Sequence, residues 1–376
     1  MGYTSQFRSL QSIFTSAQSD INIPGSEIRI INLDFQSDTS LNDYVNKKDS
    51  HITENSSFSY PVFIPADKTS DKVIILLHGL NEKSWIKYLT WAYTLTESTG
   101  SYVVLFPISF HINRCPGEWK DPRAMSDFMK NRNSGLNIEM SSFANVALSN
   151  RLTEDPMRFL YSGYQTLTDI VKLLKTIRDG AHPLIPGTGN FNFFAYSIGA
   201  FLAEIILLGN PENLLTRSRL FIFSGGSVFS NMRGTSKLIM DRLAFEKIFS
   251  FYMTDFEKSI SEDNPMTNFL RSNEAGIAFR SMIDLERFRT FRENIFKRLK
   301  GQIHAITLMK DTVIPAAGVV KTLSSWNREL WDTVEVWDFP YPYSHENPFP
   351  VFNTPISQEV DQCFDRLFFK AKAFLQ

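Results

Sequence analysis

The sequence predicts a doubly wound α/β fold with a mostly parallel sheet and an inserted helical cap. Short apolar stretches of strand length alternate with stretches whose apolar residues recur at helical spacing, which is the pattern of a parallel sheet covered by helices. Residues 73–77 are all branched and apolar, as expected of a strand buried on both faces. Polar residues follow directly after several of these stretches, at the end of a parallel sheet where ligands bind.

The first half of the chain contains four expected strands and two expected helices. The strands cover residues 27–35, 58–64, 72–77 and 102–108, and the helices cover residues 85–99 and 167–177. Gly100 and Gly180 follow the two helices, where glycine commonly ends a helix. Pro61 interrupts the second strand and predicts an edge position or a bulge there.

The second half continues the alternation of strands and helices, apart from one long helical interruption between its second and third expected strands. Strands are expected at residues 191–196, 219–223, 303–309 and 333–339, with helices at 201–208, 317–323 and 360–371. We therefore expect an N-terminal extension over 1–26, a core over 27–226 and 301–376, a long insertion at about 109–160 and a helical cap over 227–300. Arginine and glutamate alternate in the cap, which favours a solvated, salt-bridged face.

Composition narrows the function classes. The chain has 376 residues, 43% of them hydrophobic, so it can bury a large core. Its 39 basic and 40 acidic residues give no support to nucleic acid or an acidic membrane surface as a partner. We find no uncharged apolar run long enough to cross a bilayer, no secretory signal and no metal-ligand spacing. Two widely separated cysteines, Cys115 and Cys363, favour free thiols and therefore a cytoplasmic protein. We also expect no metal and no cofactor.

Ser197 lies at an expected strand-to-helix turn. The run 191–196 reaches this serine, and residues at helical spacing begin directly after it. Small residues surround it, with Ala195 two positions before and Gly199 and Ala200 after. A nucleophile elbow needs this arrangement, because only small side chains fit beside so tight a turn. The alternative is an ordinary strand–helix connection in which Ser197 caps the helix.

An acid and a base follow Ser197 in the chain. Asp311 is the first acidic residue after the strand at 303–309, and the preceding strand ends in Ser224 and two glycines without a carboxylate. His345 is the last histidine and follows the last expected strand. A serine becomes a good nucleophile when a histidine takes its proton and a carboxylate orients that histidine. Alternatively, Asp311 caps a turn and His345 is an ordinary loop histidine.

These residues resemble the α/β-hydrolase superfamily, and in particular its uncharacterised bacterial members. The resemblance covers about residues 27–376 and rests on the segments LLHGLN, AYSIGA, KDTVIP and SHENP. It implies that Ser197 is the nucleophile, Asp311 the acid and His345 the base. It also implies an oxyanion hole formed by the backbone N–H groups of Leu80 and Ile198. The chain departs from the family pattern at Ala195, where a glycine is usual.

The sequence says less about the substrate. His111, Arg114 and Trp119 follow a strand on the active-site side and are candidates for substrate binding, although a surface loop held by its own contacts is the favoured explanation. An apolar cap over a serine suggests a small acyl substrate with an apolar portion. We expect a hydrolase of carboxylic esters that works through an acyl-enzyme. The alternatives are a peptidase or thioesterase with the same triad, or a non-catalytic binding protein that keeps the fold.

Overall fold

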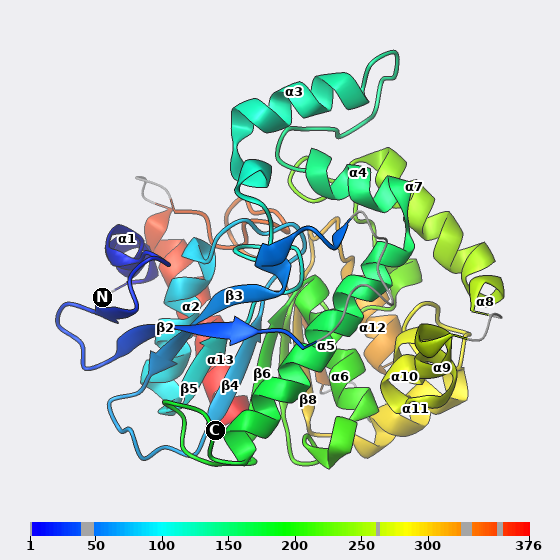
Figure 1. Ribbon diagram of the computed structural model, residues 1–376. Coiled ribbons are helices and arrows are strands. Elements are labelled where there is room, and N and C mark those ends of the chain that lie inside the picture. Colours follow the sequence, from blue (N-terminus) through cyan, green and yellow to red (C-terminus); the bar gives the residue numbers. More distant parts are fainter. Residues whose placement is uncertain (1, 39–48, 261–263, 325–332, 352–355) are drawn as a thin grey trace.

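The computed structural model describes residues 2–38, 49–260, 264–324, 333–351 and 356–376, which form a nine-stranded sheet with helices on both faces (Figure 1). The strand order is β1-β2-β3-β5-β4-β6-β7-β8-β9. The strands are β1 (Asp20–Asn22), β2 (Arg29–Gln36), β3 (Ser57–Ile64), β4 (Val73–Leu77), β5 (Tyr102–Leu105), β6 (Phe191–Tyr196), β7 (Leu220–Phe223), β8 (Ile303–Leu308) and β9 (Val334–Trp337). The run from β5 to β9 is parallel, whereas β1, β2 and β3 pair antiparallel.

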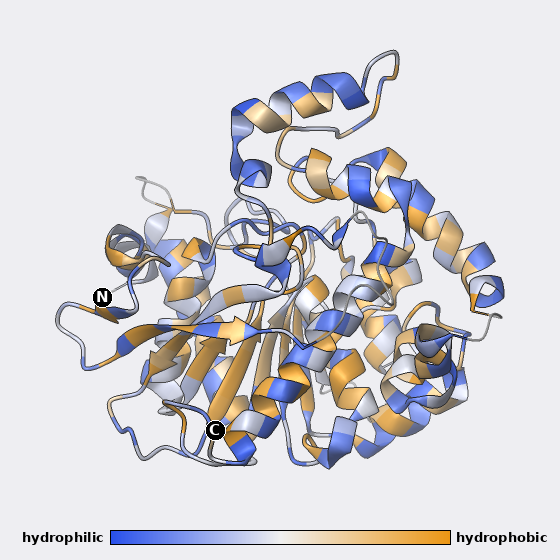
Figure 2. Cartoon of the chain, viewed as in Figure 1, coloured by the Kyte–Doolittle hydropathy of each residue, from blue (hydrophilic) through white to orange (hydrophobic). Residues whose placement is uncertain are grey.

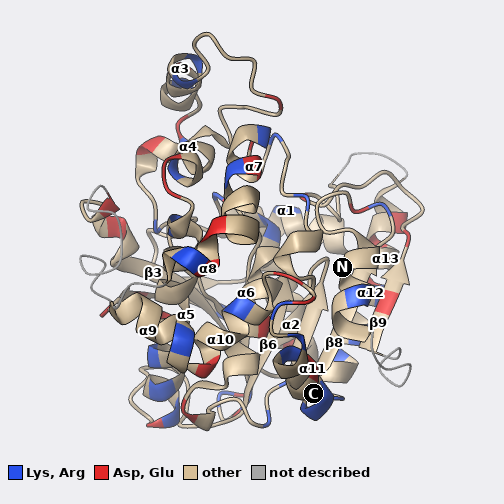
Figure 3. Ribbon diagram, turned by 90° about the vertical axis from the view of Figure 1, so that its right-hand side faces the viewer, with Lys and Arg blue, Asp and Glu red and all other residues tan. Residues whose placement is uncertain are grey.

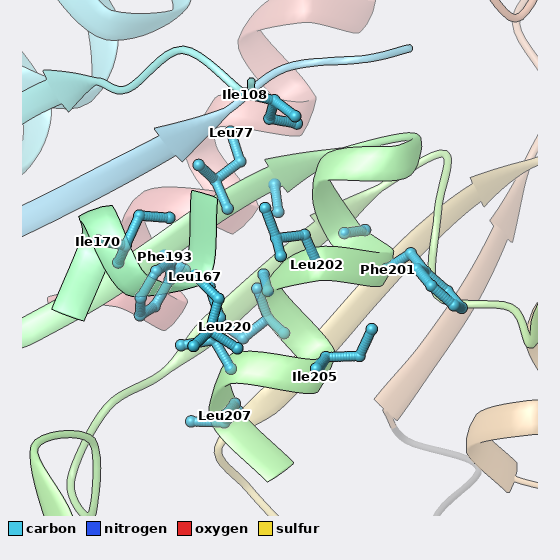
Figure 4. Close-up of a cluster of buried hydrophobic side chains, with 14 of the residues drawn as sticks. Leu77, Ile108, Leu167, Ile170, Phe193, Phe201, Leu202, Ile205, Leu207 and Leu220 are labelled. Atoms are coloured by element: carbon cyan, nitrogen blue, oxygen red, sulfur yellow. The ribbon is translucent and has the colours of Figure 1, made fainter. Parts of the chain in front are cut away.

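The central strands are apolar on both faces, and each face has its own core (Figure 2). Along β4, Ile74 and Leu76 belong to the core that includes α1 (Tyr3–Ile13), α2 (Ile86–Thr99) and α13 (Ser357–Leu375). The alternate residues of β4 belong to the opposite core, with α5 (Met157–Arg178), α6 (Ile198–Gly209) and α12 (Ala316–Ser324). Figure 4 shows this second core, where side chains of α5 and α6 meet the sheet. The result is the α/β-hydrolase-type fold that the sequence predicts.

The expected N-terminal extension packs closely on this domain. The Tyr3 ring stacks on Phe364 of α13 with ring centroids 4.2 Å apart. The backbone N–H of Thr4 donates to Asp361 at 2.8 Å, and β1 adds a short strand beside β2. The first helix therefore covers part of the apolar face of α13, and the segment is integral to the domain.

Pro61 lies in an interior strand, although proline predicted an edge or a bulge. It pairs with Asn32 of β2 on one side. On the other side, β5 pairs with β3 only at Val62 and Phe63. The sheet tolerates Pro61 because the short strand β5 does not reach it, so no ladder hydrogen bond is lost there.

The insertion and the cap segment are both helical. The insertion contains η4 (Gly117–Lys120), α3 (Pro122–Arg132), α4 (Val146–Glu154) and the start of α5, and the cap segment contains α7 (Arg242–Ser250), a π-helical turn (Phe251–Asp255), α8 (Phe256–Ser259), α9 (Pro265–Ser272), α10 (Glu274–Ser281) and α11 (Arg289–Arg298). Helices α3, α4 and α7 lie together beyond one end of the sheet, whereas α9, α10 and α11 lie beside α6 (Figure 1). Only part of the expected cap therefore covers the end of the sheet.

Acidic and basic residues of the cap segment pair with one another (Figure 3). Arg280 contacts Glu257 at 2.6 Å, and Arg289 contacts Glu293 at 2.6 Å. This agrees with the salt-bridged face that the alternating charges predict.

Cys115 and Cys363 are free thiols. Among the described helices, none combines the length and apolar character needed to cross a membrane.

Candidate active site

Ser197 occupies a strained turn between β6 and α6. Its backbone has φ 57° and ψ −125°, a conformation that costs free energy for any residue other than glycine. The turn packs tightly against the end of β4, because a Cβ on Gly199 would lie 2.7 Å from the carbonyl oxygen of His78 and from the backbone of Leu77. Gly199 is thus required by a close approach of two backbones.

His345 lies against this serine. Its Nε2 is 2.7 Å from Ser197 Oγ, and the histidine is 3% exposed. The Tyr196 hydroxyl donates to the carbonyl oxygen of His345, and the Tyr196 ring stacks on the imidazole with centroids 5.5 Å apart. The residue before the serine therefore also holds the histidine in position. Sequence reasoning missed this role, because Tyr196 looked like one more aromatic residue of a buried strand.

Asp311 completes the line of side chains. One carboxylate oxygen is 2.7 Å from His345 Nδ1. The other accepts hydrogen bonds from the backbone N–H groups of Val313 at 2.9 Å and Ile314 at 2.8 Å. The structure thus brings together the three residues that the sequence singled out. Asp338, a neighbouring acid, contacts Tyr343 and Lys310.

Two backbone N–H groups face no protein acceptor at this site. Ile198 is the first residue of α6, and Leu80 follows His78 and Gly79 at the end of β4. In the described ranges, neither N–H donates a hydrogen bond to the protein. The N-terminus of a helix favours negative charge, and free N–H groups can bind an anion. His78 shapes the loop, since its Nε2 accepts from Ile108 N–H at 2.9 Å and its Nδ1 lies 2.8 Å from the Gly79 carbonyl.

A partly buried polar chain connects the loop after β4 to the loop of His345. Gly79 N–H donates to the Tyr88 hydroxyl at 2.9 Å, and this hydroxyl donates to Glu82 at 2.7 Å. Lys87 pairs with Glu82 and donates to the carbonyl oxygen of Glu346 at 3.0 Å. One lysine thus contacts both loops. No pattern in the sequence pointed to this lysine, because an acid and a base near a helix start are most often a solvated pair.

The insertion and the cap segment meet above Ser197. Asn81, in a left-handed conformation with φ 61°, donates to the carbonyl oxygens of Ala144 at 2.9 Å and Leu238 at 2.7 Å. Asn145 of the insertion donates to the carbonyl oxygen of Ser236 at 2.9 Å. The two covering segments are therefore tied to each other and to the loop that carries Leu80.

Two apolar cavities lie beneath this cover. The smaller, of about 30 Å³, is lined by Leu80, Phe159, Ser197, Ile198, Phe229, Met232, Gly234, Ile239, Met240, Phe245, Ile248, Val313 and Ile314. The larger, of about 70 Å³, shares Leu80, Phe159 and Ile198 with the smaller and extends between α4, α5, α6 and α9. Both have smaller volumes than typical ligand pockets. They meet at the shared residues, of which Ile198 directly follows Ser197, and Ser197 itself lines the smaller one.

The three candidate substrate-binding residues occupy different places. His111 lines the larger cavity. Arg114 is fully buried elsewhere, where it pairs with Asp169 at 2.8 Å and donates to Asn55, so it supports the fold beside β3. Trp119 is half-buried on the far side of Arg151 and lines neither cavity at Ser197. A buried arginine and a displaced tryptophan look the same in sequence as residues that line a pocket.

The described residues contain no group of three or more His, Cys, Asp or Glu side chains placed to hold a metal ion.

A search among curated proteins by sequence gives no match. Similar solved structures include carboxyl esterase 2 from the mycorrhizal fungus Tuber melanosporum, with 11% identity, coverage of 99% of this chain and 98% of that chain, and a TM-score of 0.46. A fungal esterase from Rhizomucor miehei has 12% identity, coverage of 98% and 90%, and a TM-score of 0.44. An esterase of Pyrococcus furiosus has 13% identity, coverage of 90% and 92%, and a TM-score of 0.39.

At these identities and scores the fold assignment rests on the strand order and the helix layers described above. One family model matches residues 3–376, which is nearly the full length. The chain therefore belongs to the family of unknown function DUF6051.

Proposed function

We propose that this protein is a serine hydrolase that cleaves carboxylic esters through an acyl-enzyme. The observation that carries the proposal is the continuous line from Ser197 Oγ to His345 Nε2 and from His345 Nδ1 to Asp311, with both distances at 2.7 Å. In this arrangement the histidine can take the serine proton, and the carboxylate orients the ring and stabilises its positive charge.

The reaction follows from these contacts. Ser197 Oγ attacks the ester carbonyl while its proton moves to His345 Nε2. The negative charge that develops on the carbonyl oxygen is stabilised by the N–H groups of Leu80 and Ile198, each worth roughly 3–4 kcal/mol. His345 then gives its proton to the leaving alcohol. Water, activated by the same histidine, releases the acid and restores Ser197.

The surroundings favour an ester with apolar parts on either side of the carbonyl. The two apolar cavities meet beside Ser197, so an acyl chain and an alcohol group have separate places. Helices α3, α4 and α7 act in this proposal as the cap over the site. We also place the protein in the cytoplasm, because both cysteines are free thiols.

A panel of substrates with one acyl group tests this proposal. A short-chain acyl group would be offered as an ester, a thioester and an amide to the wild type and to Ser197→Ala. We expect the wild type to prefer the ester, and Ser197→Ala to lower kcat by about 10⁴-fold or more. A preference for the thioester or the amide would point to a thioesterase or a peptidase. Hydrolysis that is unchanged in Ser197→Ala would overturn the proposal.

A further inference from the structure

One nitrogen in the larger cavity has no partner. His111 lines this cavity and is 5% exposed. Its Nδ1 lies 2.8 Å from the carbonyl oxygen of Ser109, which can only accept, so Nδ1 carries the proton and Nε2 carries a lone pair. Within the described part of the chain, Nε2 has no hydrogen-bond partner. In contrast, the Nε2 of the adjacent His78 accepts from Ile108 N–H at 2.9 Å.

The imidazole of His111 stays neutral. Burial lowers the pKa of His111 well below its ordinary value of 6.5, and the neighbouring His78 lowers this pKa further. At physiological pH its Nε2 is therefore an acceptor only. A buried acceptor without a donor destabilises the folded protein, and a ligand with a suitable donor would remove this penalty.

A complementary donor lies in the same cavity. Arg151 also lines it, is 7% exposed and has an Nε without a partner among the described residues. Asp49 accepts from Arg151 Nη2 at 2.9 Å and also pairs with Arg158 at 2.7 Å, and Arg158 pairs in addition with Glu154 at 3.0 Å, so the two arginines face two carboxylates. Two residues that line the cavity thus carry one unpaired acceptor and one unpaired donor, both buried, in a lining that is otherwise mainly apolar.

The backbone around His111 is strained. Phe110 has φ 65° and Ile112 has φ 51°, and the second value is a marked outlier for a β-branched residue. Hydrogen bonds hold the segment, since Phe110 N–H donates to Asn55 at 3.1 Å and Ile112 N–H donates to the carbonyl oxygen of Glu82 at 3.0 Å. Backbone strain of this kind persists only where the surrounding structure over-determines it, and it is concentrated at active sites and ligand-binding sites.

We propose that the larger cavity binds an apolar chain bearing a hydroxyl group, which donates to His111 Nε2 and accepts from Arg151 Nε. A hydroxyl is the simplest group that both donates and accepts, whereas a carboxylate only accepts and an ammonium only donates. This inference rests on the proposed ester hydrolysis for its substrate class. The cavity meets the proposed oxyanion site at Leu80 and Ile198, so the hydroxylated chain is one of the two halves of the ester.

Matched ester pairs test which half carries the hydroxyl. Ethyl hexanoate is compared with its hydroxyhexanoate positional isomers, and hexyl acetate with the monoacetates of hexanediols. We expect one hydroxylated ester to exceed its plain partner in kcat/KM by about tenfold or more, since one hydrogen bond is worth about 1.4 kcal/mol. In His111→Phe, which keeps a ring but lacks the acceptor, this ratio should fall to about one.

Two control variants separate the hydrogen bond from the shape of the cavity. Leu152→Ala enlarges the same cavity and should keep the preference for the hydroxylated ester. If His111→Phe does not fold, His111→Gln keeps a donor for Ser109 and an acceptor for the ligand, and should retain part of the preference. A wild type without any preference, or a preference that survives in His111→Phe, overturns the inference.

A binding measurement distinguishes this inference from the proposed hydrolysis. Ser197→Ala protein is titrated by calorimetry with hexanoic acid, hydroxyhexanoic acids, hexanol and hexanediols. Tighter binding of one hydroxylated compound than of its plain partner supports the site even if no ester is cleaved, provided that this difference disappears in the double variant Ser197→Ala/His111→Phe. Equal binding of the hydroxylated and plain compounds overturns the site even if esters are cleaved.

Discussion

Two buried carboxyl groups in this protein have opposite surroundings. Asp311, at the carboxyl end of the sheet, is 4% exposed and has His345 and two backbone N–H groups as partners. Glu204, in the middle of α6, is 0% exposed, and neither of its oxygens has a partner among the described residues. The same chemical group is thus surrounded by donors in one place and by apolar packing in the other.

The difference shows which of the two regions supplies hydrogen-bond donors to a charged group. Three donors around Asp311 match an ionised carboxylate, which can orient a histidine and stabilise its positive charge. Around Glu204, burial raises the pKa of the carboxyl well above its ordinary 4.5, against a smaller lowering by the charge of Arg292. Its helix packs closely on α10, since a Cβ on Gly209 would lie 2.6 Å from the Cα of Ala275. The helix layer therefore disfavours a charge on its acid, whereas the sheet edge surrounds its carboxylate with donors.

The largest expected effect comes from removing the anion at the sheet edge. Asp311→Asn should lower kcat/KM for the best ester by about 10⁴-fold, because an amide donor favours the wrong tautomer of His345. Thermal unfolding and kcat/KM of the same preparation provide the measurement.

The matched control is Asp338→Asn, which changes the exposed acid bonded to Tyr343 and Lys310. It should leave kcat/KM within about threefold, because surface ion pairs contribute little. Full activity in Asp311→Asn, or an equal loss in Asp338→Asn, would contradict the role of Asp311.

A smaller effect is expected at the polar chain behind the site. Lys87→Met removes the contact between the loop of Gly79 and the loop of His345. We expect kcat to fall by about 10- to 100-fold with KM nearly unchanged, because a small misplacement of reacting groups is enough for such a loss. Steady-state kinetics with the best ester measure this split.

The conservative variant Lys87→Arg keeps a donor for Glu346 and a positive charge for Glu82. It should restore most of kcat, whereas a role limited to stability would show in the melting temperature of Lys87→Met and leave kcat of the folded fraction intact. The second pattern would remove Lys87 from the positioning of the site.

The smallest effect concerns Glu204 and appears in stability alone. The folded pKa of Glu204 lies above its unfolded value, so folding is favoured at low pH and loses stability as the pH rises above about 4.5. Glu204→Gln removes this loss and should add about 1–3 kcal/mol to the free energy of unfolding at pH 8, with little difference at pH 4. Urea unfolding at the two pH values measures this. A variant that is less stable at pH 8 would show that Glu204 is charged and paired in solution.

The fold could be predicted from the sequence, which also singled out Ser197, Asp311 and His345 because each follows an expected strand. It could not place Arg114 or Trp119, since burial of a long side chain depends on partners distant in the chain, such as Asp169 for Arg114. It also missed Lys87, whose contact with Glu346 joins residues far apart in sequence. Helical patterns alone also do not say which face of the domain a helix covers, so the sequence could not separate α7, beyond the end of the sheet, from α9, α10 and α11, beside α6.

Intact-mass analysis after treatment with a fluorophosphonate probe tests the central claim most directly. An activated serine attacks such a probe and stays covalently modified, whereas an ordinary serine does not react. We expect one adduct on the wild type, mapped to the peptide that contains Ser197, and none on Ser197→Ala. A folded wild type that remains unmodified, or a Ser197→Ala variant that is modified equally, would contradict the account of this site as a serine hydrolase.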